Sequence, residues 1–392
     1  MLRIAYLDHT GELGGAEHVL LLLLSGFAQS QVTPILICAE EGPFPEKARR
    51  LAIKTEIVNL PTFISLSVVV GRLKILNPVA VIRNAFALLR SALRVRPILQ
   101  MHEVRIVQTN SAFAHIYGGL AARLIGIPCV WYFHDFVERD RLMGLTALVW
   151  RILAYFLATN VIAVSKAVEK SIGAGTRCSA IYVGQPDAPK ETPFERVRSS
   201  LGLDEQAILV GYVGRIAYVK GLDNLVMAAE KITALDSRVH FVVMGESLFG
   251  ESGVKAALAE MVELRGINHR WHWLGYDHDA FSKIRDFDFL VLPSRREALG
   301  VVLLEAGMAA KAVVATWVGG IPEIVVNGET GILVPPDNPD ELARAMLRLV
   351  DSPEQAIEMG RKARERITSL FSLPRYYKEF DRLYRSLAGQ EK

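Results

Sequence analysis

Short apolar runs alternate with helix-patterned segments along most of the chain. The first half holds six runs of strand length, at residues 3–7, 35–39, 105–108, 129–133, 161–164 and 180–183. The second half holds five more, at residues 208–213, 240–244, 272–274, 289–292 and 312–315. Strands that alternate with helices are typical of a parallel sheet covered by helices on both faces. The pattern therefore predicts an α/β fold.

The alternation stops once and then begins again, which indicates two domains. A turn-rich stretch from Gly184 to Pro193 separates the halves. The tail beyond Asp340 has a helical pattern broken only by two prolines, and its last part, residues 375–387, could cross back to the first half. We therefore expect two Rossmann-like parallel-sheet domains, 1–185 and 186–374, facing each other across a cleft, with a returning helix at 375–392.

Composition supports two buried cores and makes several classes of protein unlikely on physical grounds. The chain has 392 residues, 51% of them hydrophobic, which is too long for one ordinary core. Cys38, Cys129 and Cys178 show no CxxC spacing, so neither a disulfide framework nor a zinc site is expected, and the expected compartment is the reducing cytoplasm. The start lacks the apolar core of a signal peptide, as expected for a mature protein. No apolar run is long enough to predict a membrane-spanning helix.

Charge is small overall, at +3, but unevenly distributed. Residues 57–102 contain no acid and several arginines. Within them Ile82, Ala85, Phe86, Leu89 and Leu93 recur at helical spacing, with Arg83, Arg90 and Arg94 on another face. Such a helix could lie on anionic lipid, as peripheral membrane contact at the inner face of the membrane, or pack its apolar stripe on the sheet. Nucleic acid is a less favoured partner, because no recognised binding module accompanies the charge.

Two carboxylates lie eight residues apart near the end of the second sheet. Glu297 falls in the loop after the strand at 289–292, and Glu305 lies in the following helix. Carboxylates suit the vicinal hydroxyls of a sugar, and free N–H groups at a helix start suit phosphate. Alternatively, one acid stabilises the helix dipole and the other is merely solvated.

Two cations follow the first strand of the second half. Arg215 comes directly after Gly214, and Lys220 precedes Gly221. At the ligand-binding edge of a sheet they suit a diphosphate, whose charge grows as a sugar–phosphate bond breaks. A solvated basic turn is the alternative.

The first half offers weaker candidates. Gly14 and Gly15 precede a helix predicted from Ala16 to Phe27 and would let backbone approach a ligand closely, although a tight turn explains them equally well. His134 ends the strand at 129–133, a position that is structural or catalytic, and Asp135 beside it either orients the ring or faces an acceptor.

Several segments together resemble the retaining, nucleotide-sugar-dependent glycosyltransferases of family 4, which have the two-domain GT-B fold. The resemblance is carried by segments that occur in the family's order: Gly14–Glu17, His134–Asp135, Gly214–Arg215, Lys220–Gly221, Glu297 to Glu305, Gly319–Val325 and Asn327–Pro336. They span nearly the whole chain. The resemblance implies that the first domain binds the acceptor and the second the nucleotide-sugar donor.

Residue by residue, the resemblance implies a donor site. Glu305 would hold the nucleotide ribose, Glu297 a donor-sugar hydroxyl, and Arg215 with Lys220 the diphosphate. His134 would contact the donor sugar. Further contacts are expected from the Leu299–Gly300 turn with the N–H groups of Gly300, Val301 and Val302, and the base would be bordered by Gly245, Gly275 and Tyr276.

The resemblance also implies retention of anomeric configuration, with no cofactor and no metal. No Asp-x-Asp triplet of metal-using glycosyltransferases is present. Ala298 and the Ala310–Ala312 turn depart from the family pattern, as does Gly184–Asp187 in the linker. The expected activity is transfer of a hexose-type sugar to a glycan, glycolipid or lipid-linked acceptor in cell-surface polysaccharide assembly.

Alternative functions are compatible with the same sequence features. An epimerase or a glycan phosphorylase could use the same scaffold, and a non-catalytic paralogue could bind a nucleotide sugar. A dinucleotide dehydrogenase is disfavoured because residues 11–15 lack the GxGxxG spacing.

Overall fold

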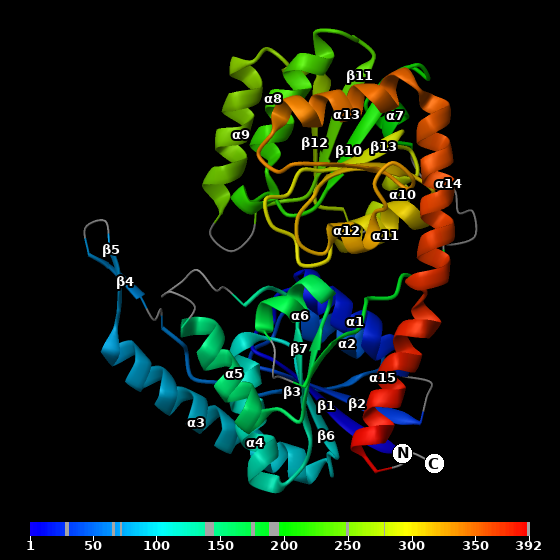
Figure 1. Cartoon of the computed structure of the whole chain (residues 1–392). Helices are drawn as coiled ribbons and strands as arrows, with labels where there is room; N and C mark the ends of the chain where they lie inside the picture. Colours follow the sequence, from blue (N-terminus) through cyan, green and yellow to red (C-terminus); the bar gives the residue numbers. More distant parts are fainter. Residues whose placement is uncertain are drawn as a thin grey trace. The chain divides into compact units, whose positions relative to one another are not determined.

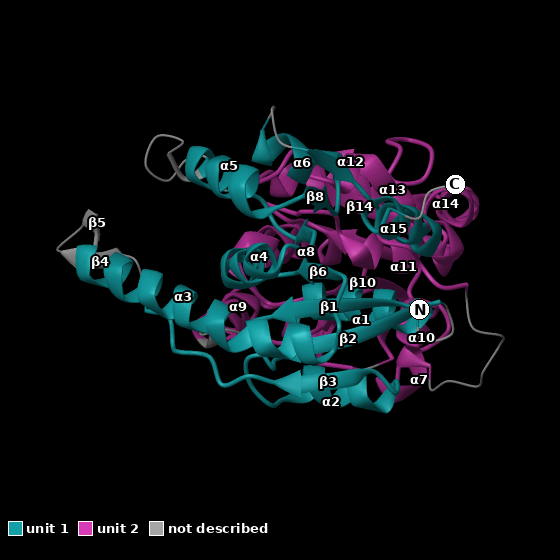
Figure 2. Ribbon diagram, turned by 90° about the horizontal axis from the view of Figure 1, so that it is seen from below, with its two compact units in different colours: residues 1–182, 376–392 teal, residues 183–375 magenta. Residues whose placement is uncertain are grey.

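A computed structural model describes residues 1–27, 31–64, 67–70, 73–137, 145–173, 177–187, 196–247, 251–277 and 279–389. The chain forms two compact units, one made of residues 1–182 with 376–392 and the other of residues 183–375 (Figure 2). Part of the predicted linker and Arg72 of the basic stretch lie outside the described residues.

The first unit is built on a seven-stranded parallel sheet in the order β3-β2-β1-β6-β7-β8-β9. Its strands are β1 Leu2–Asp8, β2 Val32–Cys38, β3 Lys54–Ile57, β6 Ile106–Thr109, β7 Cys129–Phe133, β8 Asn160–Ala163 and β9 Cys178–Ala180. The chain moves outward from β1 to β3 and then returns to β6 on the other side of β1. The strand order therefore reverses between β1 and β6, where loops part and leave room for a ligand.

Helices cover both faces of this sheet (Figure 1). They are α1 Gly15–Phe27, α2 Pro43–Arg50, α3 Pro78–Met101, α4 Ala112–Ile125, α5 Leu145–Leu157, α6 Lys166–Ile172 and the C-terminal α15 Leu373–Leu387. A short antiparallel hairpin, β4 Ser67–Val70 and β5 Leu73–Leu76, precedes α3. Helix α15 supplies aromatic rings to the core, and Tyr384 lies 6.4 Å from Tyr6 and 5.7 Å from Phe27 between ring centroids.

Helix α3 leaves its apolar stripe exposed and buries the opposite face. Its buried positions are mostly small or polar, among them Ala80, Ala87 and Ser91. The stripe that includes Phe86 and Leu93 is exposed. Small side chains let α3 pack closely on α4, and the alternative in which the stripe covers the sheet is therefore wrong.

The second unit repeats the architecture with six parallel strands in the order β12-β11-β10-β13-β14-β15. They are β10 Ile208–Val213, β11 Val239–Met244, β12 Trp271–Gly275, β13 Phe289–Leu292, β14 Ala312–Thr316 and β15 Ile332–Val334. The helices are α7 Val197–Ser200, α8 Leu222–Thr233, α9 Ser252–Leu264, α10 Ala280–Ile284, α11 Val301–Met308, α12 Ile321–Ile324, α13 Pro339–Asp351 and α14 Pro353–Leu370, with 3₁₀ turns η1 Tyr218–Lys220 and η2 Asn268–Arg270. Here the strand order reverses between β10 and β13.

The predicted fold class is confirmed in each unit, since both sheets are parallel and covered by helices. The predictions missed the short edge strands β3 and β15 and placed β9 two residues too late. Edge strands are weakly patterned because only part of their surface is buried, as the exposed Lys54 and half-buried remainder of β3 illustrate.

Candidate functional site

In the second unit, charged residues from two strands meet where the strand order reverses. Lys220 follows β10 and Glu297 follows β13, and the Lys220 Nζ donates to Glu297 Oε2 at 2.7 Å. The Ser294 hydroxyl donates to the same oxygen at 3.1 Å. Among the described residues Glu297 Oε1 has no hydrogen-bond partner, and an ammonium group has two further donors. The pair can therefore bind a ligand without being broken.

The turn that carries Lys220 is held against the β13–α11 loop by backbone contacts. The Arg295 N–H donates to the Val219 carbonyl at 2.8 Å. Gly221 has φ 66°, and a Cβ there would lie 2.1 Å from the Pro293 carbonyl oxygen. Only glycine fits this close approach, so the position of Lys220 depends on the glycine that follows it.

Arg295 fixes the same turn through its side chain. Its guanidinium pairs with Asp223 and Asp337, at 2.6 Å in each case, and lies 4.2 Å from the ring centroid of Tyr218. The fork of N–H groups that makes bidentate contacts possible is particular to arginine. Sequence reasoning missed this residue, because its partners are 72 and 42 positions away in the chain.

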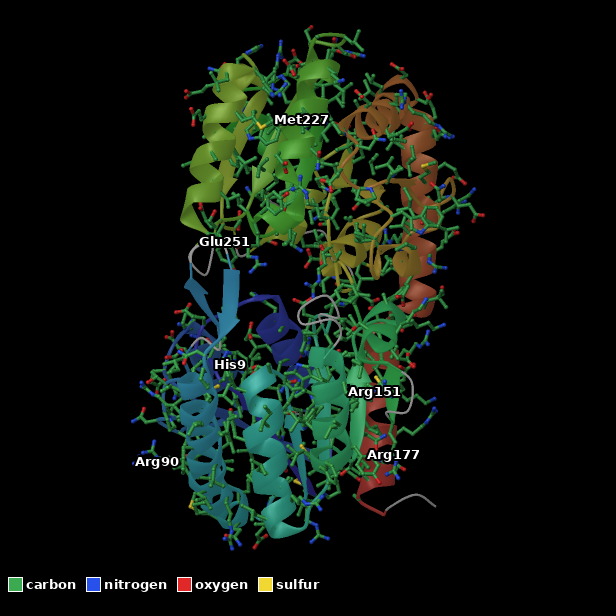
Figure 3. All side chains as sticks on the ribbon, turned by 60° about the vertical axis from the view of Figure 1, so that its left-hand side comes forward. His9, Arg90, Arg151, Arg177, Met227 and Glu251 are labelled. Carbon is green, nitrogen blue, oxygen red and sulfur yellow. The ribbon has the colours of Figure 1, made fainter. Side chains whose placement is uncertain are left out.

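Arg215 lies in the same neighbourhood. Its Nε is 3.6 Å from Glu251 Oε2, at the start of α9 (Figure 3). Its carbonyl accepts a hydrogen bond of 2.8 Å from the Tyr212 hydroxyl. Burial raises the pKa of Tyr212, the Glu297 carboxylate raises it further, and the Arg215 guanidinium lowers it. Both charges therefore act on one buried hydroxyl.

Glycine loops at the ends of β10, β11 and β12 are joined by backbone hydrogen bonds. Gly214 N–H donates to Met244 at 3.0 Å, and Gly245 N–H donates to Gly275 at 2.7 Å. A Cβ on Gly245 would lie 1.9 Å from the Gly214 carbonyl oxygen. Tyr276, next to Gly275, is exposed. These predicted positions share one edge of the sheet.

The predicted residues of the β13–α11 loop have different environments. Gly300 has φ 88° and begins α11, Leu299 is buried, and Val301 and Val302 are half-buried in the first turn. Glu305 is half-buried, and burial raises the pKa of its carboxyl to about 7. Within the described part of the chain Glu305 forms no ion pair, so Lys220 joins Glu297 but not Glu305.

Departures from the family pattern have local consequences. Ala310 has φ 55°, a conformation that favours glycine. The Ala298 carbonyl oxygen would lie 2.4 Å from a Cβ on Gly320, whose N–H donates to Glu297 O at 3.0 Å. The β14–α12 loop is thereby fixed to the loop that carries Glu297.

In the first unit, acids gather where β1 ends. Asp8 is buried, its Oδ1 accepts from the His9 N–H at 2.7 Å, and its Oδ2 has no partner among the described residues. Burial alone would lower the pKa of His9, but Asp8 raises it overall. Burial, followed by the charge of Asp8, raises the pKa of Glu17. Sequence reasoning did not single out Asp8 or His9, although their place at a strand end was a usable signal.

The predicted residues of this unit lie near the same edge. Gly14 N–H donates to Glu17 Oε2 at 2.8 Å, while a Cβ on Gly15 would meet nothing within 4 Å. The His134 Nε2 is buried without a partner among the described residues, and burial lowers the pKa of His134 to about 4. Its imidazole is thus neutral at pH 7. Asp135 is exposed and accepts from the Phe136 N–H at 2.7 Å.

Two further properties concern only the described residues. They contain no group of three or more His, Cys, Asp or Glu side chains that could hold a metal ion. No helix among them is both long and apolar enough to span a membrane.

Each half of the chain matches a glycosyltransferase family. Residues 13–184 match the family described as Glycosyltransferase Family 4, and residues 193–366 match Glycosyl transferases group 1. Alpha-maltose-1-phosphate synthase of Mycolicibacterium smegmatis is 30% identical over 318 residues, covering 72% of this chain and 79% of that protein. Alpha-D-kanosaminyltransferase of Streptomyces kanamyceticus is 32% identical, but the match covers only 51% of each chain.

Solved structures show the same fold. Anabaena HepE in complex with UDP and glucose has a TM-score of 0.81 at 23% identity, covering 98% of this chain and all of that one. Sucrose-phosphate synthase from Thermosynechococcus elongatus has a TM-score of 0.80 at 20% identity, covering 100% of both chains. The predicted GT-B fold is confirmed.

Proposed function

Because the chain belongs to the glycosyltransferases of family 4 and group 1, we propose that it transfers a sugar from a nucleoside-diphosphate-sugar donor to a glycan, glycolipid or lipid-linked acceptor. The Lys220–Glu297 ion pair at the strand reversal of the second unit is the observation that carries this proposal. It sets a phosphate-binding cation directly beside a hydroxyl-binding acid. The UDP and UDP-glucose complexes of HepE make UDP-glucose the first donor to test.

In this proposal the second unit binds the donor. Lys220 and Arg215 would neutralise the diphosphate, and they would stabilise the transition state more than the ground state because charge grows on the leaving phosphate. The free Oε1 of Glu297 would accept from a sugar hydroxyl. Glu305 would accept from the ribose hydroxyls, and the glycine loops ending at Tyr276 would border the base.

The proposed reaction retains the anomeric configuration without a metal. The acceptor would attack from the face that the nucleotide leaves, and a leaving-phosphate oxygen would take the acceptor's proton. The new glycosidic bond forms as the sugar–phosphate bond breaks, so atoms and charges balance. Lys220, Arg215 and the first N–H groups of α11 would provide the positive charge that a metal supplies elsewhere.

The first unit would bind the acceptor in this proposal. His134 would contact the donor sugar with a neutral imidazole, and the open space beside Gly15 would admit the ligand at the start of α1. An acid-free stretch from residue 57 to 102 supports an acceptor presented at the inner face of a membrane.

Donor titration by calorimetry tests the proposal. UDP-glucose, GDP-, ADP- and dTDP-sugars are compared for the wild type and for Lys220→Ala, with Lys231→Ala, on an exposed face of α8, as a matched control. We expect one donor class to bind and Lys220→Ala alone to weaken it by tenfold or more, since about 1.4 kcal/mol is tenfold. Failure of every nucleotide sugar to bind would contradict the proposal.

Products distinguish the alternatives. Nuclear magnetic resonance of the new glycosidic bond reports whether configuration is retained. Conversion of donor without acceptor would indicate an epimerase, dependence on free phosphate a phosphorylase, and binding without turnover a non-catalytic protein.

A further inference from the structure

Helix α3 exposes a continuous apolar stripe. Its side chains recur at helical spacing and include Ile82, 60% exposed, and Phe86, 70% exposed, with Val79, Leu89 and Leu93 in the same row. The opposite face of α3 is buried. An apolar row of this length on an outer helix is unusual for a surface that faces only water.

Basic residues border the stripe, and no acid accompanies them. A rotation of about 100° per residue puts Arg83 and Arg90 along one border and Arg96 along the other. All three are exposed, and Figure 3 shows Arg90 projecting away from the unit. Residues 57–102 contain no Asp or Glu. The surface is therefore apolar along its centre and positive at its edges.

Helix α5 adds a second exposed apolar face. Ile152, Tyr155 and Phe156 are exposed, with Tyr155 at 79%, and Arg151 beside them is exposed as well. Helices α3 and α5 both pack on α4, and the three helices lie side by side (Figure 3). Tyrosine, with an apolar ring and a polar hydroxyl, is typical of the membrane interface, and Tyr155 fits that position.

We infer that the exposed stripe of α3, supported by α5, docks on an anionic lipid surface, with apolar side chains among the acyl chains and the bordering arginines at the headgroups. Charge selects this occupant over a second copy of the chain, since pairing two acid-free helices would set arginines against arginines. The inference makes specific the membrane contact proposed above, and vesicle binding tests it without any sugar transfer.

Co-sedimentation with vesicles of phosphatidylcholine, with and without phosphatidylglycerol, tests the inference on the full chain. We expect binding only when the anionic lipid is present, and weaker binding at high salt. Phe86→Ser should weaken it about tenfold through lost apolar burial. Arg83→Gln with Arg90→Gln should weaken it by about 25-fold, as each basic residue near the surface contributes about 1 kcal/mol, or about fivefold.

The matched control changes equally exposed apolar residues of the second unit. Leu235 and Leu264 are 73% and 81% exposed, and their replacement by serine should leave vesicle binding unchanged. An unchanged far-ultraviolet circular dichroism spectrum and an unchanged thermal unfolding curve show that a variant is folded. Vesicle binding needs no nucleotide sugar, so its outcome is independent of the proposed function. Equal binding to neutral vesicles, unaltered binding of the α3 variants, or a solution dimer that Phe86→Ser dissolves would overturn it.

Discussion

The Lys220–Glu297 ion pair is partly buried, with side-chain exposures of 19% and 12%. Removing either partner leaves the other charge poorly solvated. We expect Lys220→Met and Glu297→Gln each to lower the free energy of unfolding by about 1–3 kcal/mol, and the double variant to lose less than the sum. Urea unfolding of the four proteins measures the difference, and strictly additive losses would show that the pair does not couple.

Glu305 provides a pH signature. Its folded pKa of about 7 lies above the ordinary value of 4.5, so the folded state holds the proton more tightly than the unfolded chain. The resulting stability is fully present below about pH 4.5 and is lost as the pH rises through about 7. Relative to Glu305→Gln, the wild type should therefore lose stability across this window in thermal unfolding.

Donor binding should change in the opposite direction. An ionised Glu305 accepts hydrogen bonds better than the neutral acid, so wild-type affinity should rise as the pH passes about 7. The Gln variant should show no such rise. A pH-independent ratio between the two proteins would refute the assigned contact.

At this scale the sequence singled out Lys220 and Glu297 separately, but it predicted neither the ion pair between them nor the residues that support it. Lys220 directly precedes a glycine, and Glu297 lies just before a predicted helix, so both stand in recognisable motifs. Arg295 lies two residues before Glu297, but no motif marks its role. That role comes from its ion pairs with Asp223 and Asp337, which are far away in the sequence and come close only in the folded chain. The place of Asp8 at the end of an apolar strand was its one usable signal in the sequence, because an acid there has no spacing rule of its own.

Among the structural elements, the glycine after the η1 turn allows two effects of a substitution to be measured apart: the strain of a positive φ and the overlap of an added Cβ with neighbouring atoms. Gly221 and Gly202 have nearly the same φ, 66° and 65°, but a Cβ would lie 2.1 Å from Pro293 O at the first and meet nothing within 4 Å at the second. Gly202→Ala should cost about 1–2 kcal/mol from conformation. Gly221→Ala should cost about 1–3 kcal/mol more from overlap and also weaken donor binding. Equal losses in denaturant unfolding would show that space does not matter there.

Element prediction succeeded where burial is complete. Strand β10 has the predicted bounds because an apolar run between turn signals permits few registers, whereas β3 and β15 at the edges gave no clear run. The face of α3 could not be chosen from periodicity, since both an apolar stripe and a row of small residues can pack. The neighbouring helix decides which one does.

At the scale of the whole molecule, α15 ties the end of the chain to the first unit. Tyr376, Phe380 and Tyr384 are fully buried. Phe380→Ala should destabilise the first unit by about 3–5 kcal/mol, while Ile357→Ala, at a site 71% exposed on α14, should change stability by less than about 0.5 kcal/mol. Denaturant unfolding is monitored both by circular dichroism and by UDP-glucose binding, and a transition that leaves donor binding intact assigns the lost stability to the first unit. Loss of donor binding in the first phase would mean that the units do not unfold separately.

This chain topology also governs the order of synthesis. The first unit contains residues 1–182 and 376–392, so the ribosome completes the whole second unit before it releases the helix that closes the first core. Until then the nascent sheet carries an uncovered aromatic surface around Tyr6 and Phe27, of the kind that chaperones recognise. The half that is translated first is therefore the half that matures last.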